Sequence, residues 1–464
     1  MATAGRDVLV AGVGMIPFTK PGQNAPYDQM GSEAIRLALK DAGVDYSHVE
    51  QAYAGYVFGA SCAGQRTVYQ AGMTGIPIVN VNNNCSTGST ALFLARQAIE
   101  SGAADCVLAV GFEQMTPGAI PQLFTDRVSP FEDFDKTCDE LVDVELPLAL
   151  RYFGGAGQAH MKKYGTTLAD FAKVRAKASR HAAKNPLSVF RNVMTEEEVL
   201  GSQVIWPGVM TRPMACPPTC GGAAAILVSA DFAKKHAIKP SVRIAAQAMT
   251  TDRPVALESK DMIELVGRDM ALRASKAVYE KSGVGPQDIR VVELHDCFAH
   301  NEVITYESLG LCPEGGAQKF IADGDNTYGG RVVTNPSGGL LSKGHPLGAT
   351  GLAQCAELTW QLRGQADQLP VLPGDGRAQP RRAARQAGHR HRACAAWRTA
   401  LRLPPHGLCR RPADLPAARG RHLRQEGRGA GIHGARDTRH QPARRACGGS
   451  GGNDGGAQWL ISRN

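Results

Sequence analysis

Continuous apolar runs along the first quarter of the chain predict buried strands. Residues 8–13 read VLVAGV and residues 105–111 read DCVLAVG, and such runs are typical of strands covered on both faces. Two further strands are predicted at residues 51–58 and 78–81. All of these runs are too short to cross a bilayer, because a transmembrane helix needs about 20 apolar residues. We therefore expect no transmembrane segment.

Amphipathic segments between these runs predict helices. Apolar residues from Met30 to Ala42 recur at helical spacing, and Gly43 is suited to end that helix. A second helix is predicted over residues 86–99. Strands that alternate with helices indicate an α/β fold with a parallel sheet covered on both faces.

The same order of elements returns about 240 residues further along the chain. A strand is predicted at residues 242–249, a helix at 262–281 and another strand at 289–294. We infer two similar halves that arose by internal duplication. Residues 116–203 lack the alternation and are predicted to form an inserted loop domain. Its stretch 162–191 holds eight Lys and Arg against one acid, which fits either a solvated helical face or contacts to a polyphosphate.

Charge is divided unevenly along the chain. The 464 residues carry 52 Lys and Arg against 43 Asp and Glu, a net charge of +9. Residues 369–464 hold 19 Arg and five acids, a net charge of +14, so residues 1–368 carry −5. The basic excess therefore belongs to one terminal segment, and the acidic remainder does not indicate a nucleic-acid-binding protein.

The segment 369–464 is rich in Arg, Ala, Gly and Pro and contains no Lys, Phe, Tyr or Met. Three interpretations are open: a disordered basic arm that binds nucleic acid or acidic lipid, a flexible extension, or GC-rich coding sequence read out of frame. We favour the third, because a functional basic arm usually mixes Lys with Arg. The segment is expected to be disordered and to bind no nucleic acid.

The N-terminal sequence and the spacing of the cysteines indicate the cellular compartment of the protein. The first residues have neither the basic region nor the cleavage site of a signal peptide. The 12 cysteines are irregularly spaced, which favours free thiols in a reducing compartment over a disulfide framework. We expect a cytoplasmic protein in a bacterium or a peroxisomal protein in a eukaryote.

The motif NNNCSTGST, residues 82–90, places a cysteine between a predicted strand and a predicted helix. Backbone N–H groups and the helix dipole at such a junction lower the pKa of a thiol and favour the nucleophilic thiolate. The small neighbouring residues leave room for a substrate. A buried structural cysteine is the alternative, and we assign Cys85 as the candidate nucleophile.

Two other motifs carry histidine. HDCF directly follows a predicted strand and supplies His295 as a hydrogen-bond donor and Cys297 as a thiol for proton transfer. GGLLSKGHPLGATG, residues 338–351, places His345 at the start of a helix, among glycines that let a ligand approach closely. Each histidine alone would more often be structural, so their interpretation depends on the motifs around them.

No cofactor or metal motif is complete. Cys216 and Cys220 form a single pair without a second pair at zinc spacing. Gly12 and Gly14 lack the third glycine of a dinucleotide fingerprint, and no phosphate-binding loop is present. We therefore expect neither a metal nor a bound cofactor.

Together the three motifs resemble the thiolase superfamily, most closely its sterol carrier protein X or lipid-transfer type. They occur in the family's order and spacing, and the resemblance covers residues 6–364. It implies two βαβαβαββ halves in a five-layered αβαβα sandwich, with a loop domain inserted in the first half. The family's closing glycine-rich segment and final strand are not recognisable after Gln368, so the C-terminal half is expected to be incomplete.

Four regions follow from this resemblance. They are residues 1–115 with 204–235 as the N-terminal half, 116–203 as the loop domain, 236–368 as the truncated C-terminal half, and 369–464 as the tail.

The resemblance implies a role for each candidate residue. Cys85 is expected to take the acyl group from a 3-ketoacyl thioester, and His345 to activate Cys85 and help hold the thioester oxygen. His295 is expected to contribute to a second oxyanion site, and Cys297 to act as the acid/base. CoA enters as a substrate, and relatives imply a homodimer or homotetramer.

These roles predict an acyl-CoA C-acyltransferase of the 3-ketoacyl-CoA thiolase type, which cleaves or condenses acyl-CoA in fatty acid β-oxidation or sterol metabolism. One alternative is a steroid side-chain aldolase or a decarboxylating condensing enzyme on the same fold. Another is an inactive lipid-transfer or scaffold protein. Cys85 together with the GHP sequence at His345 argues against the aldolase.

Overall fold

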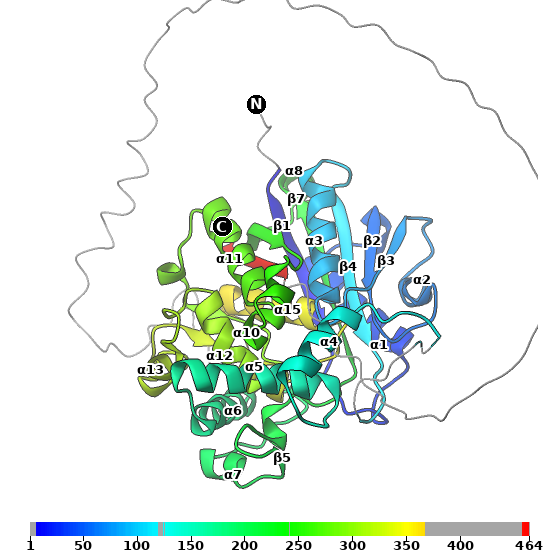
Figure 1. Cartoon of the computed structure of the whole chain (residues 1–464). Helices are drawn as coiled ribbons and strands as arrows, with labels where there is room; N and C mark the ends of the chain where they lie inside the picture. Colours follow the sequence, from blue (N-terminus) through cyan, green and yellow to red (C-terminus); the bar gives the residue numbers. More distant parts are fainter. Residues whose placement is uncertain (1–5, 119–123, 125, 241, 367–456, 464) are drawn as a thin grey trace, which may run out of the picture. The chain divides into compact units, whose positions relative to one another are not determined.

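The computed structural model describes residues 6–118, 124, 126–240 and 242–366, and the backbone of residues 457–463 (Figure 1). All of these belong to one compact unit of the chain. The predictions for residues 369–456 lie outside the described residues.

Five strands of the first half form a mixed sheet in the order β1-β7-β4-β2-β3. β2, β3 and β4 run parallel, and β7 runs antiparallel to β1 and to β4. The strands are β1 (Val8–Met15), β2 (Gln51–Gly55), β3 (Ile78–Val81), β4 (Cys106–Glu113) and β7 (Gly221–Ser229). With the helices between them, they give the order βαβαβαββ.

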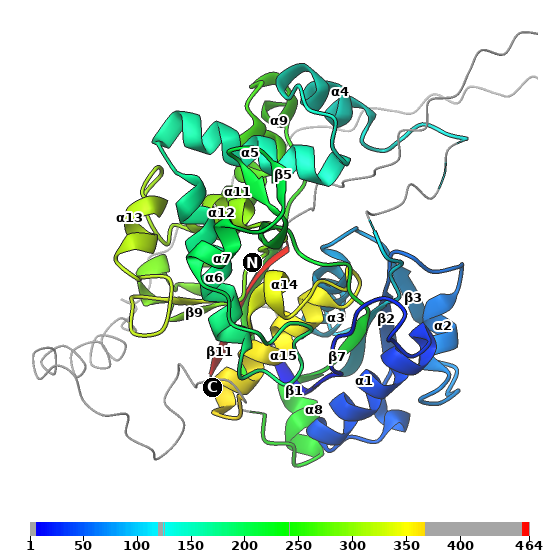
Figure 2. The same ribbon diagram turned by 90° about the horizontal axis from the view of Figure 1, so that it is seen from below.

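Helices cover both faces of this sheet, which explains its continuous apolar runs. In β1, Leu9 and Ala11 face α1 (Tyr27–Ala42), and Val8 and Val10 face α3 (Thr87–Glu100) and α15 (Thr350–Arg363). Figure 2 shows α1 on the opposite side of the sheet from α15. The predicted end of α1 at Gly43 is confirmed, with the positive φ of 65° that glycine adopts readily.

The second half repeats this order, but its strands are divided between two sheets. β8 (Val242–Met249) pairs antiparallel with β1 and so extends the first sheet, and β11 (Ala457–Arg463) pairs antiparallel with β8. β9 (Val291–Val292) and β10 (Val333–Thr334) form a separate parallel pair. β11 therefore lies beside β8 as β7 lies beside β1. No described residues form a counterpart of β4 in this half.

This arrangement corrects the prediction that the tail contributes no closing strand. That prediction is wrong for residues 457–463, whose backbone pairs with β8 over its full length. The α/β thiolase fold itself is confirmed. The second half has seven of the eight elements of a βαβαβαββ unit among the described residues.

Two other predicted elements differ from the structure. The strand predicted at residues 289–294 is only two residues long, because the N–H of Leu294 donates to the side chain of Asn335 (2.7 Å) instead of to a neighbouring strand. The helix predicted at residues 262–281 is interrupted at Gly267, where φ is +96°. It forms α10 (Met262–Leu265) and α11 (Arg268–Ser282).

The segment between β4 and β7 is a mainly helical insertion. Its core is continuous with that of the second half and includes Phe171, Met210, Leu265 and Val303. The insertion contains α4 (Glu132–Leu141), α5 (Leu148–Tyr164), α6 (Leu168–Ala182), α7 (Glu196–Leu200), β5 (Val204–Trp206) and β6 (Met210–Thr211). The other helices are α2 (Ala63–Val68), α8 (Ala230–Lys235), α9 (Val255–Glu258), α12 (Ala299–Ser308), α13 (Ala317–Ala322) and α14 (Gly339–Ser342). Among the described helices, none is long and apolar enough to cross a membrane.

Close backbone contact between the halves gives a first prediction. A Cβ added to Gly111 in β4 would lie 2.0 Å from the carbonyl oxygen of Gly348. We expect Gly111→Ala to push the two backbones apart and to lower the free energy of unfolding by about 1–3 kcal/mol. Urea unfolding measures the loss. Gly201→Ala is the control, because its Cβ meets its nearest neighbour at 3.2 Å on the surface. Equal stability of the two variants would contradict the packing.

Candidate active site

Cys85 lies in the turn between β3 and α3, two residues before the helix begins. The preceding residue, Asn84, has a φ of +45°, and asparagine is one of the few residues that tolerate this left-handed conformation. The turn leaves Cys85 partly exposed, and it lines the same pocket as Ser86 and Ser89 at the start of α3. The predicted strand-to-helix junction is confirmed. The strained residue beside the cysteine was not predicted.

His345 lies between α14 and α15 and is buried. Its Nδ1 is 2.7 Å from the hydroxyl oxygen of Thr350, and that hydroxyl donates its own hydrogen to the carbonyl of Pro346 (2.9 Å). When the hydroxyl donates to Pro346, Nδ1 of His345 carries the hydrogen and Nε2 presents a lone pair. Burial, reinforced by the neighbouring His295, holds the pKa of His345 well below its usual value. The ring is therefore a neutral base.

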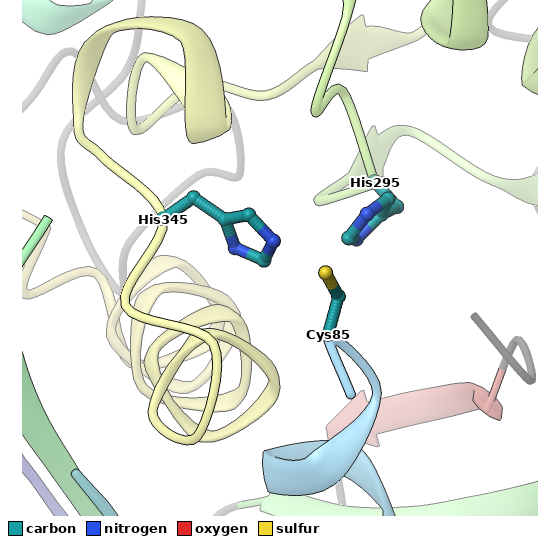
Figure 3. A group of neighbouring side chains, drawn as sticks. All are labelled: Cys85, His295 and His345. Carbon is teal, nitrogen blue, oxygen red and sulfur yellow. The ribbon is translucent and has the colours of Figure 1, made fainter. Parts of the chain in front are cut away.

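The fold brings three of the four predicted residues together (Figure 3). The Cys85 sulfur and one ring nitrogen from each of His295 and His345 all lie within 4.8 Å of one another. The two imidazole rings are 5.0 Å apart between centroids and nearly perpendicular, at 83°. Cys85 comes from the first half of the chain and both histidines come from the second, so the site exists only because α3 and α15 pack side by side.

Cys297 is not part of this group of three. Its side chain is buried in the hydrophobic core that the second half shares with the insertion. The loop that carries it is held by two contacts: Asn301 donates to the carbonyl of His295 (2.7 Å), and the N–H of Cys216 donates to the carbonyl of Cys297 (2.9 Å). The structure therefore positions the HDCF backbone firmly, and the acid/base role of Cys297 stays a prediction.

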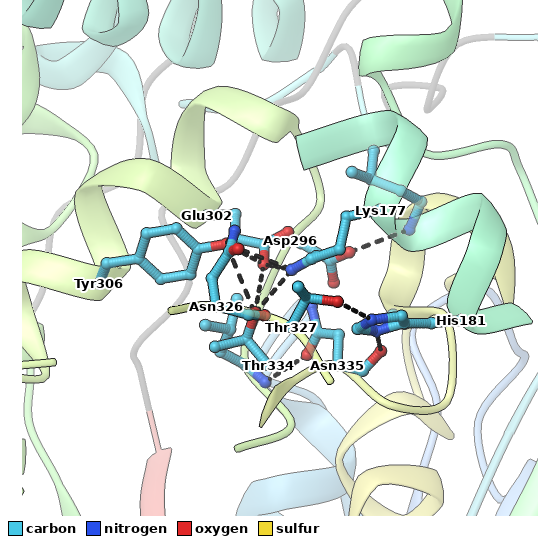
Figure 4. Close-up of polar contacts among 12 residues, drawn as sticks. Lys177, His181, Asp296, Glu302, Tyr306, Asn326, Thr327, Thr334 and Asn335 are labelled. Carbon is cyan, nitrogen blue, oxygen red and sulfur yellow. Dashed lines mark hydrogen bonds and ion pairs between the residues drawn. The ribbon is translucent and has the colours of Figure 1, made fainter. Parts of the chain in front are cut away.

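The aspartate of HDCF is tied to a buried polar cluster that sequence reasoning missed (Figure 4). Asp296 accepts a hydrogen bond from the N–H of Leu340 at the start of α14 (2.7 Å). Burial and the nearby Glu302 carboxylate raise the pKa of Asp296 to about 7. Glu302 forms a buried ion pair with Lys177 of α6 and accepts a hydrogen bond from the Tyr306 hydroxyl (2.6 Å). The cluster thus links the insertion, α12 and the HDCF loop.

This cluster also accounts for two of the eight cations in the basic stretch 162–191, whereas Lys162, Arg180 and Lys184 of that stretch are exposed, as a solvated face requires. Both proposals for that stretch, a solvated face and a polyphosphate contact, require exposed side chains. Lys177 is only 1% exposed and is paired with Glu302, and Arg175 is 4% exposed and donates to the Ser342 hydroxyl (2.8 Å). These two cations therefore stabilise the interior. The sequence signals that could have indicated this buried cluster were the basic run itself and Glu302, which follows HDCF closely.

A second acid outside the predicted set holds the loop of His345. Glu113, at the end of β4, accepts hydrogen bonds from the N–H groups of Val57 (3.1 Å), Phe58 (2.9 Å) and Gly348 (2.9 Å). It therefore ties the segment after His345 to the first half. Burial raises the pKa of Glu113 to about 7, although the three donors act in the opposite direction. The sequence signal was a single acid that ends an otherwise apolar strand.

The raised pKa of Glu113 gives a second prediction. The ordinary pKa of Glu is 4.5, so the folded state keeps this proton to higher pH than the unfolded state does. Its stabilising contribution is full below about pH 4.5 and is lost as pH rises to about 7, by roughly 3 kcal/mol. Relative to Glu113→Gln, the wild type should lose that stability in urea unfolding across this range. The exposed Glu280→Gln is the control, and parallel pH curves for wild type and Glu113→Gln would refute the assignment.

Comparison with known proteins places the chain in a family. Residues 8–198 match the N-terminal domain of thiolase, and residues 256–373 match a thiolase C-terminal domain-like family. Sterol carrier protein 2 of Bos taurus is 54% identical over 374 residues, which cover 79% of this chain and 68% of that protein. Acetyl-CoA acetyltransferase of Methanothermobacter thermautotrophicus is 34% identical over 79% of this chain and 93% of its own length.

A solved structure supports the same fold. The Ltp2-ChsH2(DUF35) aldolase superposes with a TM-score of 0.66 at 24% identity, over 79% of this chain and 93% of the other. At this identity the likeness concerns the fold alone. Because both thiolase domains are matched and a relative is more than half identical, the chain belongs to the thiolase family.

Proposed function

We propose that this protein is an acyl-CoA C-acyltransferase that works through an acyl group on Cys85. The observation that carries the proposal is the pairing of Cys85 with the neutral, buried His345, one ring nitrogen of which lies within 4.8 Å of the cysteine sulfur. A base that is neutral at physiological pH can take the thiol proton as the sulfur attacks a carbonyl. The acetyl-CoA acetyltransferase relative supports acyl-CoA as the substrate class.

In the cleavage direction, the Cys85 sulfur attacks the 3-keto carbon of a 3-ketoacyl-CoA while His345 takes the thiol proton. The bond between C2 and C3 then breaks, the acyl group stays on Cys85, and the acetyl-CoA carbanion accepts a proton. CoA next gives its thiol proton to the site, and its sulfur takes the acyl group from Cys85. The products are acetyl-CoA and a shortened acyl-CoA, and condensation is the reverse.

His295 and Cys297 take the remaining roles in this proposal. His295 stands beside the sulfur and is suited to donate to the oxyanion that forms on the attacked carbonyl, and such donors are worth about 2.7–4 kcal/mol each. Cys297 protonates the acetyl-CoA carbanion, which fits its position in the firmly held HDCF loop. CoA and acyl-CoA are substrates, with no resident cofactor. A homodimer or homotetramer remains a prediction.

Covalent labelling tests the nucleophile. We expect wild type to bind one acyl group per chain from acyl-CoA in a rapid burst, and Cys85→Ser to take up none, as read by mass spectrometry of the intact protein. Cys138→Ser is the matched control, because Cys138 is buried in the insertion away from the site. Labelling that persists in Cys85→Ser would contradict the proposal. Retro-aldol activity that survives in Cys85→Ala would favour the aldolase instead.

Separate measurement of acylation and of 3-ketoacyl-CoA cleavage tests the acid/base role of Cys297. Cys297→Ala should still accept an acyl group from a simple acyl-CoA, because that step forms no carbanion that Cys297 would have to protonate. Cleavage of 3-ketoacyl-CoA should slow by about 10²–10⁴-fold, because the carbanion loses its proton donor. Stopped-flow measurement of both steps in one preparation separates this result from misfolding. Equal losses in both steps would assign Cys297 a structural role.

A further inference from the structure

We propose that Cys85, His295 and His345 also form a binding site for a thiophilic divalent cation such as Zn²⁺, whose binding blocks the cysteine. The site would be inhibitory, with one thiolate and two imidazole ligands and a fourth position open toward the pocket. This inference does not depend on the acyltransferase proposal, because it follows from the ligand atoms and their surroundings.

The distances are close to those that zinc requires. Zinc binds sulfur at about 2.3 Å and imidazole nitrogen at about 2.0–2.1 Å, so tetrahedral ligand atoms stand about 3.3–3.8 Å apart. The three candidate atoms all lie within 4.8 Å of one another. Side-chain shifts of about 1 Å or less therefore bring the three ligand atoms to zinc-binding distances. Three protein ligands with one open position are the arrangement of many exchangeable zinc sites.

His345 is already prepared as a ligand. Its Nδ1–H donates to Thr350, which leaves the Nε2 lone pair directed away from that contact, and Nε2 has no hydrogen-bond partner among the described residues. Metal-bound histidines characteristically donate their other ring N–H in this way, which fixes the tautomer and the ring orientation.

Sequence spacing could not predict this site. Sequence motifs for metal sites contain ligands close together, as in the pair Cys216 and Cys220, whereas these three ligands come from three separate loops. They meet only after the two halves pack. An exposed pair of rings, His48 and His236, also lies close together, at 4.6 Å between centroids, and it must be separated from this site by experiment.

Binding involves proton release and no redox step. The cation forms a bond to the Cys85 sulfur, and the thiol proton leaves to solvent. Binding therefore releases one proton per cation bound. A bound cation and an acyl group exclude each other, because both occupy the same sulfur.

Cobalt absorbance of the full chain tests the site without any acyl substrate. Co²⁺ should bind wild type with a sulfur-to-metal charge-transfer band at one equivalent per chain, and Zn²⁺ should displace it. Cys85→Ser should abolish that band. Thr350→Val should weaken binding by about 10–100-fold, because it removes the partner that orients His345. His345→Gln should weaken binding at least as much.

Two controls make the outcome decisive. The double variant His48→Gln and His236→Gln should keep the band, as should Cys62→Ser, which removes an exposed thiol elsewhere. Prior alkylation of Cys85 with iodoacetamide should abolish it. Absence of a charge-transfer band in wild type, or a band that persists in Cys85→Ser, would overturn the metal site. Neither result would affect the acyl-labelling test, so the two proposals can fail separately.

Discussion

The close packing of α3 against α15 is the constraint on which the candidate site depends. Each helix starts just after one of the central residues, Cys85 before α3 and His345 before α15. The helices approach closely because glycines stand at the contact: a Cβ on Gly351 would lie 2.3 Å from the backbone nitrogen of Ser89, and a Cβ on Gly88 would lie 2.8 Å from the Gly348 carbonyl. Larger side chains at the starts of α3 and α15 would push the helices apart and separate the Cys85 sulfur from the His345 imidazole.

Burial then gives the two central residues their chemistry. The same packing that joins the helices removes His345 from water, and this lowers its pKa and keeps it a neutral base. Thr350, in the first turn of α15, fixes which nitrogen carries the hydrogen. Glu113 and the Lys177–Glu302 pair act indirectly, because they hold the loops that carry His345 and His295. The proposed acyl transfer and the proposed cation binding both use the lone pair on Nε2 of His345.

The sequence predicted the parts of the fold that local patterns encode. The limits of β3 and β8 were predicted to the residue. The prediction failed at β9, where the N–H of Leu294 donates to the side chain of Asn335 instead of to a neighbouring strand, so that the strand ends early. Pairing of residues 457–463 with β8 was not predicted, because strand partners are determined by distant residues and not by the segment itself.

The candidate site, like the fold, was only partly predictable from local sequence patterns. Cys85, His295 and His345 were recognised from motifs, but their meeting point depends on a contact between residues about 50–260 positions apart. Glu113 and Lys177 were missed because each acts through hydrogen bonds to a remote backbone or side chain.

The protonation of His345 is the central claim, and nitrogen NMR of the histidine-labelled protein measures it directly, with His345→Gln to assign the signal. We expect the His345 ring to be neutral, with its hydrogen on Nδ1, both at neutral pH and at pH values below the usual histidine pKa. An imidazolium ring at neutral pH, or a hydrogen on Nε2, would contradict it.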